Sequence, residues 1–146
     1  MNAIPDYMTD KHRHCDDIFA AAEAEVAKRN WALAEQKWQL FVAELERHLQ
    51  AEETILFPEF EQATRMTSGP TQVMRMEHEQ MRGLVQSLNT SLAEKNSEDF
   101  LGFSETLMVL MQQHNMKEEM MLYPMCQQNI SDTEQLTAQL KQHCEQ

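Results

Sequence analysis

Two segments of the chain carry metal-binding residue types at the same spacing. "HLQAEETILFP" (48–58) and "HNMKEEMMLYP" (114–124) both read H-x-x-x-E-E-x-x-L-aromatic-P and begin 66 residues apart. Helical side chains four residues apart lie about 40° apart around the axis, so His48 points the same way as Glu52, and His114 as Glu118. Each motif therefore predicts one imidazole and one carboxylate ligand for a metal ion. The second glutamates lie about 140° from their histidines, and we expect both to be solvated: Glu53 and Glu119.

A lone histidine precedes each motif. His14 stands 34 residues before His48, and His78 stands 36 residues before His114. Each half of the chain thus reads as a helix with one histidine, a turn, and a helix with His-x-x-x-Glu. Two such hairpins packed about a pseudo-twofold axis would bring four imidazoles and two carboxylates into one core. His12 lies about 200° around the helix from His14, so we expect it to face away.

This donor set favours a pair of metal ions. Imidazole suits iron, zinc, copper and nickel, and carboxylates can bridge two cations. With both glutamates bridging, each ion would have two histidines and two carboxylate oxygens, which leaves positions open for an oxo, hydroxo or external ligand, whereas structural zinc sites are closed. We predict two iron ions, with manganese or zinc as alternatives. The predicted ligands are His14, His48, Glu52, His78, His114 and Glu118.

Other metal and nucleotide motifs do not fit. "HEQMR" (78–82) resembles the zinc-protease motif H-E-x-x-H, but arginine replaces its last histidine. Ferritin-type di-iron bundles use E-x-x-H, and no glutamate stands three residues before any of the six histidines. The sequence also lacks a P-loop, G-x-G-x-x-G and G-x-S-x-G.

The elements that must position these residues are helices. Helical periodicity and the breaking residues predict helices over about 9–29, 31–57, 70–94 and 97–123, with Pro58 and Pro124 stopping or kinking two of them. Ser97 is the expected cap of the fourth helix, and the pattern Ser131-Asp-Thr-Glu is expected to cap a short last helix. Almost nothing reads as a strand. We therefore predict an all-α, up-and-down four-helix bundle with a short C-terminal extra helix.

Length and composition suit one soluble domain. The chain has 146 residues, 42% of them hydrophobic, and we expect a single domain over 1–146, with the bundle at about 9–126 and a tail at 127–146. The net charge of −12 and the lack of a Lys/Arg stripe argue against nucleic acid and anionic membranes as partners. Three widely spaced cysteines and the absence of a long apolar run favour a cytoplasmic protein. The tail, where His143 is expected to be solvated, could dock on the bundle or mediate dimerisation.

Together, "KHRHCDDIF", "HLQAEETILFP", "RMEHEQMR" and "HNMKEEMMLYP" resemble the haemerythrin family, in the branch called HHE cation-binding domains, over about residues 9–126. The resemblance implies an up-and-down four-helix bundle around a non-haem di-iron centre. Oxygen-carrying haemerythrins have a further histidine where this chain has Arg82, and an aspartate where it has Glu118. One histidine fewer would leave the second iron another exchangeable position, and Arg82 could hold an anion or a peroxide.

The set of four histidines and two glutamates is similar to that of di-iron proteins that repair iron-sulfur clusters under nitrosative and oxidative stress. Those usually carry an N-terminal cysteine-motif domain, which this sequence does not show. Our leading hypothesis is a di-iron protein that binds dioxygen, nitric oxide or peroxide in sensing, scavenging or storage, and any signalling would need a separate protein partner. The alternatives are iron handling for cluster repair, a peroxidase or oxidase using Tyr123, Glu77 or Arg82, and a metal-free bundle acting through protein contacts.

Overall fold

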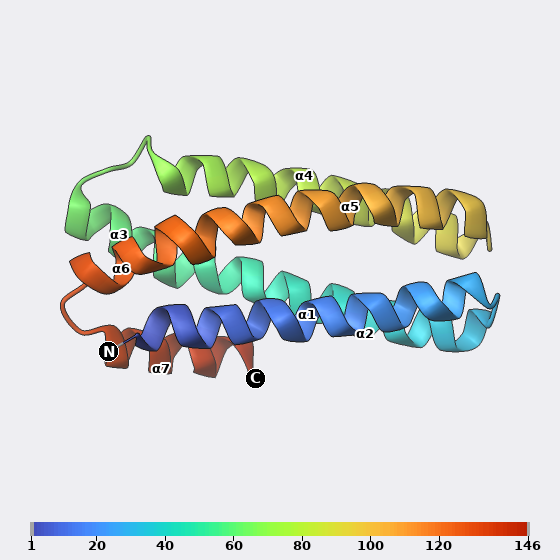
Figure 1. The fold of residues 1–146 in the computed structure, drawn as a ribbon, viewed down its shortest axis with the longest axis horizontal. Helices are drawn as coiled ribbons and strands as arrows, with labels where there is room; N and C mark the ends of the chain where they lie inside the picture. The colour runs from blue at the N-terminus through green and yellow to red at the C-terminus, as the bar shows by residue number, and fades with distance from the viewer. Residues whose placement is uncertain (1, 146) are drawn as a thin grey trace.

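The computed structural model describes residues 2–145 and contains helices but no strand within that range. Four antiparallel helical rods run up and down, and a short helix lies beside two of them (Figure 1). This confirms the predicted all-α bundle with a C-terminal helix. In chain order the elements are α1 (Ala3–Ala27), α2 (Trp31–Ala51), η1 (Glu52–Leu56), α3 (Phe57–Thr64), α4 (Pro70–Ala93), α5 (Ser97–Lys117), η2 (Glu118–Leu122), α6 (Tyr123–Asn129) and α7 (Thr133–Cys144).

The helix ends differ from the sequence predictions in detail. The first helix begins at Ala3 rather than near Thr9, because the fully buried Ile4 and Met8 extend its apolar face into the core. Asn96, not Ser97, caps α5, its side chain accepting the N–H of Asp99 at 3.0 Å. In the same way Asp132 caps α7, accepting the N–H of Gln135 at 3.0 Å. Each of these side chains satisfies a backbone donor that the helix itself leaves free.

Both repeated motifs contain a π-helical turn, η1 and η2. The N–H of Phe57 bonds to the carbonyl of Glu52, and that of Tyr123 to the carbonyl of Glu118, each five residues back. We expected proline to stop or kink the rods, because its ring clashes with the carbonyl four residues earlier. The π turn just before each proline takes the backbone out of the α-helical register, and the rods continue as α3 and α6.

The core consists of two apolar clusters. One surrounds Trp38, Phe41 and Phe100, and the other surrounds Phe57 and Phe60. Methionine contributes to both clusters, although several methionines are exposed. Met74, Met81 and Met111 are buried, whereas Met76, Met116, Met120 and Met121 are exposed.

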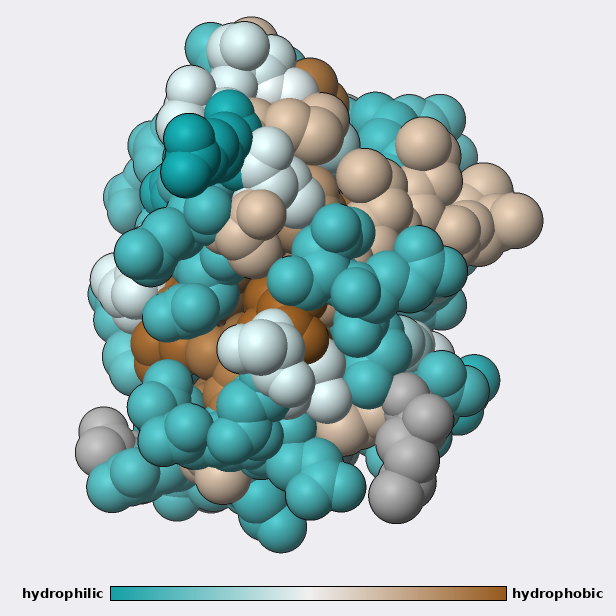
Figure 2. Space-filling view, turned by 90° about the vertical axis from the view of Figure 1, so that its left-hand side faces the viewer, coloured by the Kyte–Doolittle hydropathy of each residue, from teal (hydrophilic) through white to brown (hydrophobic). Residues whose placement is uncertain are grey.

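The C-terminal helix α7 docks on the bundle, against α1, α2 and η1 (Figure 1). It buries Leu136, Leu140 and Cys144 in the second apolar cluster. Seen from the end where α3, α6 and α7 meet, the surface is mostly hydrophilic, with hydrophobic side chains recessed between polar groups (Figure 2). Among the described residues, no helix has the length and apolarity needed to span a membrane.

Candidate metal centre

Six buried side chains form two groups of potential metal ligands between the two apolar clusters. Within each group, one nitrogen or oxygen of every side chain lies within 4.8 Å of the others. Both histidines of a group come from one helical hairpin, α1–α2 or α4–α5, and both glutamates belong to both groups. The arrangement offers two cation positions that share two carboxylates. The groups are His12, His48, Glu52 and Glu118, and Glu52, His78, His114 and Glu118.

The histidine from α1 is His12, not His14. His12 is 4% exposed and lies on the buried face of α1 with Met8, Cys15 and Phe19, whereas His14 is exposed. The expectation that His14 faces the site and His12 faces away was therefore wrong, because the buried face of α1 includes His12 and not His14. The other five predicted residues are brought together.

Several of the ligand atoms are buried without a well-directed hydrogen bond among the described residues, although His78 Nε2 and Glu52 Oε1 lie 3.0 Å apart. These are Nε2 of His48, His78 and His114, Oε1 of Glu52 and Oε2 of Glu118. Leaving a buried polar group unsatisfied costs about 1–3 kcal/mol, so native proteins rarely do it without a reason. Imidazole nitrogens and carboxylate oxygens converging in this way fit a pair of cations, which would satisfy all of these atoms at once.

Three of the four imidazoles are held from outside by a second carboxylate. An Nδ1–H···carboxylate bond fixes the tautomer and leaves the Nε2 lone pair free for a metal. Two of these carboxylates were expected to be solvated, but both are only partly exposed and contact a neighbouring helix. The Nδ1-to-carboxylate distances are 2.7 Å for His12–Glu119, 2.7 Å for His78–Glu53 and 2.8 Å for His114–Glu77.

Positively charged side chains hold two of the carboxylates that accept the Nδ1–H bonds, Glu53 and Glu77. Arg82 donates to both oxygens of Glu53 at 2.9 and 3.0 Å, and also bonds to Glu46 and Glu79. Lys117 donates to Glu77 at 2.5 Å. The guanidinium of Arg82 is thus engaged by carboxylates in the outer layer of the site, rather than free for an anion as the sequence suggested.

The hydroxyl of Tyr123 reaches into the centre. Tyr123 is fully buried, and its oxygen lies 2.5 Å from Glu52 Oε2, 2.8 Å from Glu118 Oε1 and 3.1 Å from His12 Nε2. Burial, and then the charges of Glu118 and Glu52, raise the pKa of Tyr123 well above its usual value. The hydroxyl is therefore protonated in the metal-free protein and donates to the carboxylates.

The metal-free site also holds protons on its imidazoles. Burial alone would lower the pKa of His12, but the hydrogen bonds to Glu118 and Glu119 outweigh it and raise the pKa to about 10. For His114, burial is likewise outweighed by the charge of Glu118, and the pKa rises to about 9. Burial would raise the pKa of Glu52, yet His48 and other neighbours hold it well below its usual value. Cations would take the place of these protons.

A small cavity adjoins the two cation positions. Its walls are mainly apolar or sulfur-containing side chains, and its volume of about 10 Å³ is room for about one water-sized molecule. The lining residues are His12, Cys15, Leu45, His48, Leu49, Met81, Met111, His114 and Asn115.

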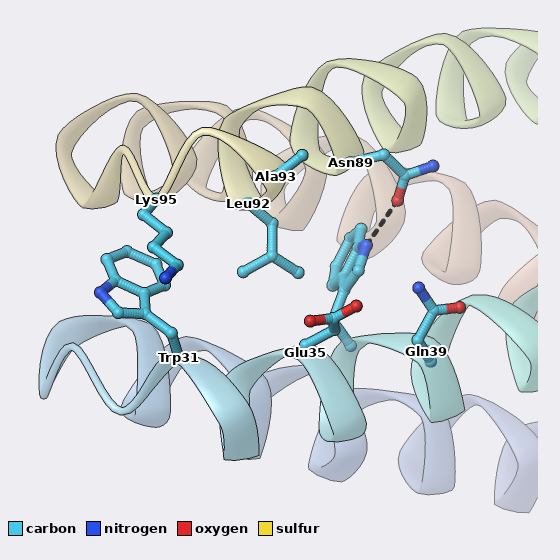
Figure 3. A pocket seen from close by; sticks show the side chains of 8 residues that line it. Trp31, Glu35, Gln39, Asn89, Leu92, Ala93 and Lys95 are labelled. Atoms are coloured by element: carbon cyan, nitrogen blue, oxygen red, sulfur yellow. Dashed lines mark hydrogen bonds between the residues drawn. The ribbon is translucent and has the colours of Figure 1, made fainter.

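A larger pocket of about 180 Å³ lies at the opposite end of the bundle, between α2 and α4 (Figure 3). There the indole N–H of Trp38 donates to Asn89 Oδ1 at 2.6 Å, so its buried polar group is satisfied. None of the candidate metal ligands lines it. The lining residues are Trp31, Glu35, Trp38, Gln39, Asn89, Leu92, Ala93 and Lys95.

The family model described as Hemerythrin HHE cation binding domain matches residues 3–126. The chain belongs to this haemerythrin family. The matched range runs from the first residue of α1 into α6, and it contains all six side chains of the two ligand groups. The haemerythrin resemblance expected from the motifs is thus confirmed, and cation binding is the property that this family's description carries. No curated protein and no solved structure gave a significant match.

Proposed function

We propose that this haemerythrin-family protein binds two iron ions and, at that pair, binds or responds to dioxygen, nitric oxide or peroxide. The observation that supports it best is the set of buried, unpartnered ligand atoms in two groups that share Glu52 and Glu118. In this proposal His12 and His48 would hold one iron, His78 and His114 would hold the other, and Glu52 and Glu118 would serve both. His12 takes the place that the sequence gave to His14.

The donor set favours iron. Each position offers two imidazoles and two carboxylate oxygens, a mixture that suits Fe²⁺ and leaves octahedral positions open to an external ligand. Manganese and zinc are the alternatives, because both accept the same ligands. When bound, the iron pair supplies the electrons for chemistry with small oxidising molecules.

The protein's own side chains would orient the metal ligands, shield the iron ions from bulk water and favour small external ligands. Glu119, Glu53 and Glu77 orient three of the imidazoles, and apolar walls keep bulk water out. The cavity beside the site has room for about one water-sized molecule, which favours a small external ligand. A sensing, scavenging or storage role fits these features, and sensing would require a separate protein partner.

Metal content and visible spectrum test the proposal. The purified protein is reconstituted anaerobically with ferrous ion, its iron per chain is measured, and spectra are recorded before and after air, nitric oxide or peroxide is added. We expect two irons per chain and new visible absorption with at least one of these molecules.

Variants connect that result to the site. Glu52→Ala and Glu118→Ala should each abolish the paired site, whereas Glu79→Ala, which removes an exposed carboxylate, should retain two irons. Two irons retained by both bridging variants would contradict the proposal.

A further inference from the structure

The two hairpins are related by a simple sequence correspondence. His12 stands 36 residues before His48, and His78 stands 36 residues before His114. His12 therefore corresponds to His78 and His48 to His114, and the six ligands obey the pseudo-twofold relation. The residues around them do not.

The first departure concerns the outer partner of the second histidine. In the α4–α5 hairpin, Glu77 stands just before His78 and accepts the Nδ1–H of His114 at 2.8 Å. The corresponding residue before His12 is Lys11, which cannot accept a hydrogen bond. Accordingly, Nδ1 of His48 is buried without a hydrogen-bond partner among residues 2–145.

The second departure concerns how firmly the remaining outer carboxylates are held. Glu53, the partner of His78, is clamped by Arg82, which stands four residues after that histidine. The residue four after His12 is Asp16, which repels Glu119 instead of holding it. Outer-layer partners raise the basicity of an imidazole and fix its ring, and losing one typically lowers metal affinity by about 10–100-fold.

A third, smaller difference acts in the same direction. Nε2 of His12 lies 3.0 Å from Glu118 Oε1, as Nε2 of His78 does from Glu52 Oε1, but Nε2 of His12 also contacts the Tyr123 hydroxyl at 3.1 Å. A cation at the first position must therefore displace one contact that the second position lacks. The extra negative charge of Glu119 and Asp16 offsets this only partly, because both side chains reach solvent, where salt screens them.

We propose that the two cation positions are unequal: the ion held by His12 and His48 is exchangeable, and the ion held by His78 and His114 is resident. This inference rests on the proposed function, because it assumes two bound cations. It makes Glu53 and Glu77 positioning residues for the resident ion, and Lys11 the residue that leaves the other ion labile. A protein built this way can take up or give away one iron while keeping the other, which favours iron handling as a second role.

Release of iron to a chelator tests the inequality. The protein is loaded anaerobically to saturation with ferrous ion, and release to excess ferrozine is followed by absorbance. We expect two phases of one iron per chain each, with rates differing at least tenfold. A single phase for both irons overturns the inference and leaves the proposed function intact. Fewer than two irons per chain at millimolar ferrous ion overturns both.

Variants assign the phases. Glu53→Gln and Glu77→Gln should each accelerate the slow phase by about 10–100-fold and leave the fast phase nearly unchanged. Glu79→Gln is the matched control, because Glu79 contacts Arg82 at 2.7 Å but no imidazole. A general loosening of the bundle would accelerate both phases. Acceleration of only the fast phase in Glu53→Gln would reverse the assignment and refute it.

Lys11→Glu supplies the acceptor that His48 lacks. We expect it to slow the fast phase at least several-fold, bringing the two rates together. If Lys11→Glu folds and loads two irons but leaves the fast phase unchanged, the missing partner of His48 is not the cause of lability. The glutamine variants keep the inference testable should Lys11→Glu fail to fold.

Discussion

Removing the Tyr123 hydroxyl should destabilise the metal-free protein far more than the metal-loaded one. Tyr123→Phe keeps the buried ring and its packing, so it creates no cavity. It deletes a donor that lies 2.5 and 2.8 Å from two buried carboxylates. A hydrogen bond to a charged group contributes about 1.5–3 kcal/mol, and we expect a loss of that size without metal.

Cations would take over the lone pairs that the hydroxyl satisfies. In the loaded protein the expected loss falls to that of a neutral hydrogen bond, about 0.5–1.5 kcal/mol. Removing the hydroxyl therefore favours the loaded state by about 1–1.5 kcal/mol, which is roughly five- to twelvefold tighter overall binding. Destabilisation of the fold and strengthening of metal binding should thus come from the same substitution.

Urea unfolding of metal-free and zinc-loaded protein measures both quantities, because zinc fills the site without redox chemistry. Tyr7→Phe is the control, since the neighbours that act on the Tyr7 hydroxyl are Cys144 and Glu145 and not the candidate ligands. Any change in its unfolding free energy should be the same in both states. Equal losses for Tyr123→Phe in both states, or none without metal, would refute the idea that this hydroxyl stands in for the cations.

Three further expectations follow from the site and the core. His12→Ala should reduce loading to one iron per chain, whereas His14→Ala should keep two; the reverse result would restore the sequence-based choice of ligand. At pH 7 the metal-free protein holds protons on His12 and His114, whose pKa values are about 10 and about 9. Metal binding should release both, so affinity rises with pH by roughly a hundredfold per unit at this pH; calorimetry in buffers of different ionisation enthalpy counts the protons, and a count of zero would contradict this. Leu140→Ala, in the fully buried seam under α7, should lower the unfolding free energy by about 2–5 kcal/mol, whereas half-exposed Leu40→Ala should cost little, as measured by urea unfolding.

The fold and most of the ligand positions could be predicted because they follow from local rules. Helical periodicity, few β-branched residues and the repeated His-x-x-x-Glu motif each depend on residues within a few turns of one another. Helix starts were less predictable. Ile4 and Met8 extend α1 because they pack into the second apolar cluster of the folded chain. Helix propensity and capping residues near Thr9 do not indicate these contacts.

The ligand from α1 could have been predicted from the spacing of the histidines. His12, not His14, gives the 36-residue separation found in the second half, and it lies on a seam of apolar residues running through Met8, Cys15 and Phe19. The roles of Glu53 and Glu119 could not be inferred in the same way. Their contacts with His78 and His12 cross between helices, and α-helical geometry places them away from the motif's own histidine.

The division of ligands between the hairpins has a consequence for how the two halves of the chain hold together. Each half supplies two histidines and one glutamate, and only residues 65–69 join α3 to α4. Each glutamate belongs to both cation positions, so each bound metal ion would have ligands from both halves of the chain. Bound metal would therefore cross-link the two halves. A chain cut within this linker should then reassemble from its fragments, helped by the apolar contacts of α7 on α1 and α2. The strength of that reassembly would report how many cations are bound, which makes the split protein a sensor of its own metal content.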